Sequence, residues 1–82
     1  MSRFSLKELS QRLLLVGGRY GLSIDIGIAP VKVGPDSYMF YATQLTEECR
    51  KTGQCLYQRF YVLTNGPDLV IMNEDKEVLN ES

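Results

Sequence analysis

Histidine and tryptophan are both missing from this chain of 82 residues. Without histidine, no imidazole can act as a general base, activate a serine or cysteine nucleophile, or ligate a metal ion. Cysteine is scarce as well, since Cys49 and Cys55 are the only two. Two thiolates do not complete a cysteine-only zinc site, and they are too few for a disulfide-rich scaffold. We therefore expect no metal, no cofactor and no enzymatic activity.

Long hydrophobic runs and a dominant charge sign are also missing. The leucine-rich run at 13–16 is far shorter than the ~20 apolar residues that cross a bilayer, and charged side chains recur through the first 12 residues, so we expect no signal peptide. Nine Lys and Arg residues against ten Asp and Glu residues give a formal charge of −1. That charge provides no general attraction to nucleic acid or anionic lipid. We expect a cytoplasmic protein, without membrane contact, whose two thiols are reduced.

Apolar residues are nevertheless plentiful enough to build a core. They make up 44% of the chain, which argues against intrinsic disorder. A chain of this length forms one domain, which we expect to span residues 1–82. Residues 73–82 hold four acids and one base, and 78–82 are expected to be a frayed acidic tail.

The first segment predicts an amphipathic helix at about residues 5–16. Ser5 and Glu8 have the spacing of a capping box, in which each side chain satisfies a backbone N–H of the other residue. Apolar residues then recur every three or four positions. Gly17 and Gly18 follow and are expected to end the helix, because glycine adopts the left-handed conformation without penalty.

The hydrophobic pattern then changes to a period of two, which is typical of half-buried strands. The expected fold class is α+β, with one N-terminal amphipathic helix packed on one face of a four- to five-stranded antiparallel meander sheet. Strands are expected near 22–29, 38–45, 55–64 and 68–72, with short additions at 31–33 and 77–79. The expected core consists of Leu6, Leu9, Leu13, Val16, Ile24, Ile26, Ile28, Phe40, Phe60, Val62, Leu69 and Ile71.

Residues 46–52 leave two interpretations open. One is a short helix that is capped by Thr46 and ended by Gly53. The other is a hairpin that turns at residues 51–53. A helix this short is costly to nucleate, so the hairpin is favoured.

The favoured hairpin decides which side chains share a face of the sheet. It places Cys49 opposite Cys55 and Tyr41 opposite Leu63. Since side chains alternate along a strand, one face carries apolar residues that the helix would cover. The other face, which a single helix cannot cover, carries Tyr41, Thr43, Leu45, Tyr57, Arg59, Tyr61 and Leu63.

An uncovered face with three tyrosines around an arginine favours a binding role, because Tyr and Arg are enriched at interface hot spots. We predict a small non-catalytic protein-binding module (an accessory, adaptor or inhibitor protein) whose partner is another protein or a second copy in a homodimer. The predicted partner-binding residues are Tyr41, Tyr57, Arg59, Tyr61 and Leu63. The alternative is a single-stranded nucleic-acid binder that stacks bases on the same tyrosines, although such platforms normally carry positive charge. Aromatic residues also suit strands without any binding role.

Overall fold

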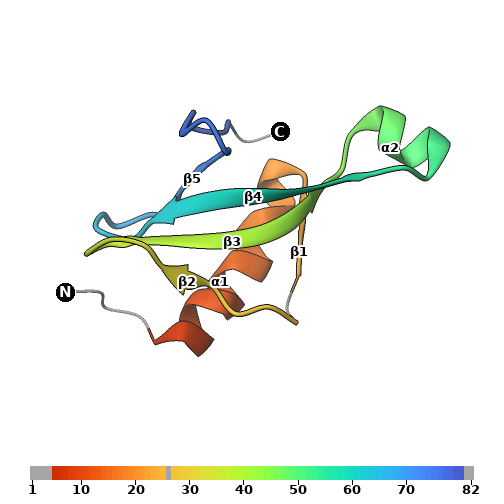
Figure 1. Cartoon of the computed structure of the whole chain (residues 1–82). Coiled ribbons are helices and arrows are strands. Elements are labelled where there is room, and N and C mark those ends of the chain that lie inside the picture. The colour runs from red at the N-terminus through yellow and green to blue at the C-terminus, as the bar shows by residue number, and fades with distance from the viewer. Residues whose placement is uncertain (1–4, 26, 81–82) are drawn as a thin grey trace.

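The computed structural model describes residues 5–25 and 27–80. The sheet order is β1–β3–β4–β5, β2 also pairs with β3, and every pairing is antiparallel. The expected α+β fold, with one N-terminal helix on an antiparallel meander, is confirmed (Figure 1). In chain order the elements are α1 (Leu6–Gly17), the 3-10 turn η1 (Gly18–Tyr20), β1 (Leu22–Ile24), β2 (Val31–Lys32), β3 (Ser37–Gln44), α2 (Glu47–Thr52), β4 (Leu56–Leu63) and β5 (Val70–Met72).

Helix α1 begins as the capping motif predicts. The Ser5 hydroxyl accepts a hydrogen bond from the Glu8 backbone N–H at 3.2 Å. Leu9 and Leu13 lie one turn apart on the buried side. Leu6, however, is 48% exposed, so its assignment to the core is wrong. Leucines lie on more than one side of this helix, and their spacing alone does not show which of them face the sheet.

The end of α1 differs from the expectation. Gly17 and Gly18 both keep helical backbone angles, and the left-handed residue that redirects the chain is Gly21, with φ 69°. Gly17 is needed for another reason, since a Cβ atom there would lie 2.9 Å from a side-chain carbon of Ile24. The missing side chain lets α1 approach β1 closely.

The expected strand at 22–29 is interrupted. The Asp25 side chain accepts a hydrogen bond from the Gly27 backbone N–H at 2.9 Å, which turns the chain away from β3. The chain pairs with β3 again at β2, which agrees with the short strand expected at 31–33. Ile28 lies in the interruption and is 44% exposed, so it is not a core residue. Ile26 lies outside the described residues.

The core lies between α1 and one face of the sheet. Phe40 and Phe60 lie at its centre, directly opposite each other, with ring centroids 5.8 Å apart. Val16 and Ile24, both expected in the core, pack against it while partly buried. Tyr38 was not among the expected core residues, but it is buried. The buried cluster comprises Leu9, Leu13, Leu22, Tyr38, Phe40, Ala42, Phe60, Val62, Leu69 and Ile71.

Residues 46–52 form a helix, so the favoured hairpin turn is wrong. The Thr46 hydroxyl accepts a hydrogen bond from the Cys49 N–H at 3.0 Å, and Gly53 ends α2 with φ 75°. Cys49 is bonded to Cys55 in a disulfide, so the expectation of two reduced thiols is wrong for this structure. Two caps and a covalent cross-link together offset the nucleation cost of so short a helix.

The presence of α2 also changes the pairing of β3 with β4. Tyr41 lies opposite Arg59, whereas the hairpin placed it opposite Leu63. The observed partner is four residues away from the expected one, and an even shift leaves every side chain on its face. The expected assignment of β3 and β4 side chains to the two faces of the sheet is therefore correct, although the expected register is wrong.

Candidate functional site

Helix α1 lies behind one face of the sheet, and the described part of the chain places no helix over the opposite face (Figure 1). We call this second surface the open face. Strand alternation and the observed register assign its members. They are Ser23, Val31, Val33, Ser37, Met39, Tyr41, Thr43, Tyr57, Arg59, Tyr61, Leu63, Val70 and Met72.

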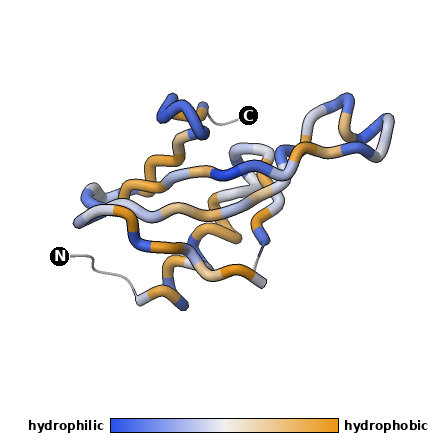
Figure 2. The backbone as a smooth tube through the Cα atoms, in the orientation of Figure 1, coloured by the Kyte–Doolittle hydropathy of each residue, from blue (hydrophilic) through white to orange (hydrophobic). Residues whose placement is uncertain are grey.

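One half of the open face is aliphatic. Val31 lies opposite Met39, and Leu63 lies opposite Val70, so these residues come from four neighbouring strands. Val33 continues the pairing of β2 with β3, because its N–H donates to the Ser37 carbonyl at 3.0 Å. Val31 and Val33 are each 49% exposed. Figure 2 shows hydrophobic residues along β2 and β5 as well as along α1. We call these five residues the apolar half.

The other half of the open face is aromatic and polar. The rings of Tyr41 and Tyr57 stack with centroids 5.6 Å apart and planes inclined by 6°. The Tyr57 hydroxyl donates to the Asp25 carboxylate at 2.7 Å, which links β4 to the chain after β1. This hydrogen bond, followed by desolvation and the negative charge of Asp25, raises the pKa of Tyr57 to about 12. Arg59 is exposed beside the pair, opposite Tyr41.

The segment after β5 lies over one corner of the open face. The Lys76 ammonium lies 3.7 Å from the centroid of the Tyr61 ring. Val78 bridges to Met72, whose exposure is only 9%. The Asn73 side chain closes the turn between them by accepting hydrogen bonds from two later backbone N–H groups. This corner is therefore already occupied by the chain itself.

The same turn gives the open face an acidic edge. Glu74, Asp75 and Glu77 are all exposed within it. The Leu79 N–H donates to the Ile71 carbonyl at 2.8 Å, so the expected fraying does not begin at residue 78. The acidic residues up to Glu77, with Lys76 among them, are consequently held at a defined place beside Tyr61 and Met72.

All five predicted binding residues lie on the open face, and the structure brings them together with residues that the sequence analysis missed. Leu45, which was expected on the same face, lies just beyond the end of β3, where its N–H donates to the Gly21 carbonyl and its side chain is 39% exposed. Met39 could have been found from its alternation with Tyr41. The expected meander already placed the edge beside β3 and β5 beside β4, but local pattern did not give the register of either pairing. The missed residues are Asp25, Val31, Val33, Met39 and Val70.

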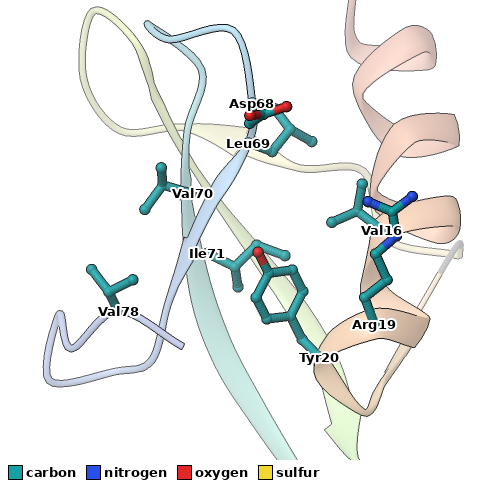
Figure 3. Close-up of a pocket in the computed structure, with 8 residues that line it drawn as sticks. All are labelled: Val16, Arg19, Tyr20, Asp68, Leu69, Val70, Ile71 and Val78. Carbon is teal, nitrogen blue, oxygen red and sulfur yellow. The ribbon is translucent and has the colours of Figure 1, made fainter. Parts of the chain in front are cut away.

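Further clefts are lined by residues from separate elements, and two of them bear on the chemistry of the chain. One, of about 350 Å³, separates the end of α1 and η1 from β5 (Figure 3). Arg19 and Asp68 stand on its opposite sides, and its other walls are mainly aliphatic (Figure 3). The second, of about 410 Å³, lies at the far tip of the sheet beside the Cys49–Cys55 disulfide. The lining of the second cleft also includes Glu48, but the two cysteine sulfurs beside it are bonded to each other and are not free nucleophiles in this structure.

Residues 5–25 and 27–80 contain no group of side chains suited to a metal ion and no helix that could span a membrane. No three His, Cys, Asp or Glu residues in those ranges are grouped so that they could hold a metal ion. Over the same ranges, every helix is too short or too polar to cross a membrane. Comparisons of the chain with protein-family models, with curated proteins and with solved structures find no match.

Proposed function

We propose that this protein is a non-catalytic binding module, acting as an accessory, adaptor or inhibitor, whose open face receives a short segment of another protein. The observation that carries the proposal is the contrast between the two faces of the sheet. One face is sealed by α1, while the other leaves aliphatic side chains from four strands next to stacked tyrosines and an exposed arginine. Contiguous apolar surface of this kind marks interaction sites.

The charges around the open face indicate the chemistry of the partner. Glu74, Asp75 and Glu77 form an acidic edge of the open face. A complementary segment therefore carries aliphatic or aromatic side chains in its middle and Lys or Arg on one side. Tyr57 and Arg59, at the other end, are of the residue types that dominate interface hot spots.

The dimensions of the open face suit a short segment of a partner. Strands about 4.8 Å apart make its four-strand width about 14 Å, and the part of β3 from Ser37 to Thr43 extends about 20 Å. The resulting plan area is roughly 300 Å². One helix or strand of a partner matches this size.

The proposal involves no catalysis, because the chain has no histidine and the two cysteines that share a cleft with Glu48 are joined in a disulfide. It also places the protein in the cytoplasm, as its composition suggests. In that compartment the Cys49–Cys55 disulfide would be open for part of the lifetime of the protein, since cytoplasmic thiols are kept reduced.

A charge placed in the apolar half tests the proposal. The purified chain is used to capture proteins from an extract of its source cells, and each captured protein is purified and titrated against it. Leu63→Glu introduces a carboxylate into the apolar half, and Leu15→Glu makes the same exchange at a site on α1 that is 79% exposed. We expect Leu63→Glu to raise the Kd about tenfold or more, and Leu15→Glu to leave it unchanged, with both variants keeping the circular dichroism of the parent.

Equal affinities of the two variants would overturn the proposal. Light scattering of the pure chain gives a second result. A dimer that Leu63→Glu dissociates would make the occupant a second copy and refute a separate partner. A shift of mixed single-stranded oligonucleotides at low salt, lost in Tyr57→Ala, would instead assign the face to nucleic acid.

A further inference from the structure

The disulfide lies at the far end of the elongated molecule, where α2 projects beyond the sheet (Figure 1). Its two cysteines differ in exposure. Cys49 belongs to α2 and is only 4% exposed, whereas Cys55 lies just before β4 and is exposed. Exposed disulfides are the ones that exchange with thiols, and exchange depends on which sulfur a thiolate can reach.

The surroundings of the disulfide are suited to a peptide-like thiol. The cleft of about 410 Å³ at the tip includes both cysteines in its lining. The amides of Gln44 and Gln54 and the hydroxyl of Thr46 line it as well. The Glu48 carboxylate and the Leu56 side chain complete the lining. A thiol that carries amide groups finds donors and acceptors here next to the sulfur that it attacks.

We propose that the tip is a site of thiol–disulfide exchange, at which the thiolate of a cysteine-containing peptide attacks the exposed Cys55 and the buried Cys49 leaves. In the first step a bond forms between the incoming sulfur and Cys55 Sγ. The Cys49–Cys55 bond breaks, and Cys49 Sγ leaves with the bonding electron pair and takes a proton from water. A second peptide thiolate then attacks the sulfur of the bound peptide and releases Cys55.

The electrons balance over the two steps. Two peptide thiols are oxidised to one peptide disulfide, and the disulfide of the protein is reduced to two thiols by the same two electrons. The reverse steps close it again. Cys55 is the attacked residue because it is exposed, whereas Cys49, although it also lines the cleft, is only 4% exposed within α2.

Thiol–disulfide exchange at this site removes the covalent bond that ties α2 to Cys55. Helix α2 has six residues, and the disulfide ties its third residue, Cys49, to Cys55 just before β4. Its other supports are the two caps at Thr46 and Gly53 and an exposed Lys51–Glu47 pair at 4.0 Å. Such an exposed pair contributes little, so opening the disulfide leaves α2 held mainly by its caps. This inference is independent of the open face.

Site mapping on the unmodified chain tests the proposal. The oxidised full-length protein is mixed with reduced glutathione at pH 8 without denaturant, free thiols are trapped with N-ethylmaleimide, and peptides are mapped by mass spectrometry. We expect glutathione on Cys55 and N-ethylmaleimide on Cys49. Glutathione on Cys49, an even division between the two, or no adduct would overturn the proposal.

Two further comparisons test the choice of sulfur and the ligand class. The lone thiol left in Cys49→Ser is expected to react with an aromatic disulfide reagent about tenfold faster than the lone thiol left in Cys55→Ser. Gln44→Leu combined with Gln54→Leu is expected to slow exchange with glutathione, and with a cysteine-containing decapeptide, relative to 2-mercaptoethanol, which has no amide. An unchanged ratio would refute recognition of a peptide thiol. If only exchange with glutathione is slowed, the thiol that the site recognises is a small thiol. If only exchange with the decapeptide is slowed, it is a cysteine of another protein.

Discussion

Tyr57 makes contacts with two other segments of the chain from its place on the open face. Its ring stacks on Tyr41 and its hydroxyl donates to Asp25, so one side chain joins β4, β3 and the chain after β1. The sequence indicated only that this tyrosine faces away from the helix. Its partner Asp25 lies 32 positions earlier, at a break in the edge that local pattern did not predict.

The Tyr57–Asp25 contact predicts a distinct titration. The pKa of Tyr57 is raised to about 12, mainly by its hydrogen bond to Asp25. The contact therefore stabilises the fold below the ordinary tyrosine pKa near 10, and this contribution is lost as the pH rises through 12. Asp25→Asn should lower the pKa of Tyr57 towards 10, as measured by NMR of the ring carbons.

Asp68→Asn serves as the control for this titration, because Asp68 is an exposed carboxylate away from the open face. It should leave the Tyr57 titration unchanged. If Tyr57 titrates near 10 in the parent chain, or if Asp25→Asn has no effect, the hydrogen bond is not formed in solution.

At the scale of elements, the packing of α1 on β1 depends on the paired glycines. Gly17 has no room for a Cβ next to Ile24, whereas Gly18 has no atom within 4 Å of a Cβ and keeps helical angles. Gly17→Ala should destabilise the fold by about 1–3 kcal/mol through overpacking. Gly18→Ala should stabilise it by about 0.5–1 kcal/mol, because it restricts the unfolded chain.

Urea unfolding of the two variants measures this difference directly. The two positions are adjacent and both glycines are replaced by alanine. The effect of alanine on helix propensity is therefore the same in both variants and cancels when their free energies of unfolding are compared. The same sign of change at both positions would contradict the close contact of α1 with β1.

Helix α2 shows where local rules compete. Thr46 and Gly53 have the residue types that begin and end a helix, and they were recognised as such. The caps favour a helix at 46–52, whereas the free-energy cost of nucleating so short a helix favours the hairpin. The disulfide favours the helix, because it ties Cys49 in α2 to Cys55 before β4 and so lowers the conformational entropy that the chain loses when α2 forms.

At the scale of the whole molecule, the two faces of the sheet should respond differently to the same mutation. Phe40 and Tyr41 are consecutive in β3 but lie on opposite faces, Phe40 at 1% exposure in the core. Phe40→Ala should cost about 3–5 kcal/mol through the cavity that it leaves. Tyr41→Ala should cost only about 0.5–1.5 kcal/mol, the scale of a lost aromatic pair.

Chemical or thermal unfolding of both variants checks this contrast. A chain of this size has a total stability of roughly 4–12 kcal/mol, so Phe40→Ala is expected to lie at the limit of folding while Tyr41→Ala remains folded. Comparable losses at the two positions would show that the open face is covered in the free protein.

The sequence by itself determined α1 and the division of β3 and β4 into two faces. A capping motif acts within one turn, and strand alternation is a local property that an even shift of register preserves. Only the tertiary structure decided the register, because it depends on α2 and on a covalent bond between Cys49 and Cys55. It also decided the apolar half, whose side chains meet only when separate strands align in one sheet.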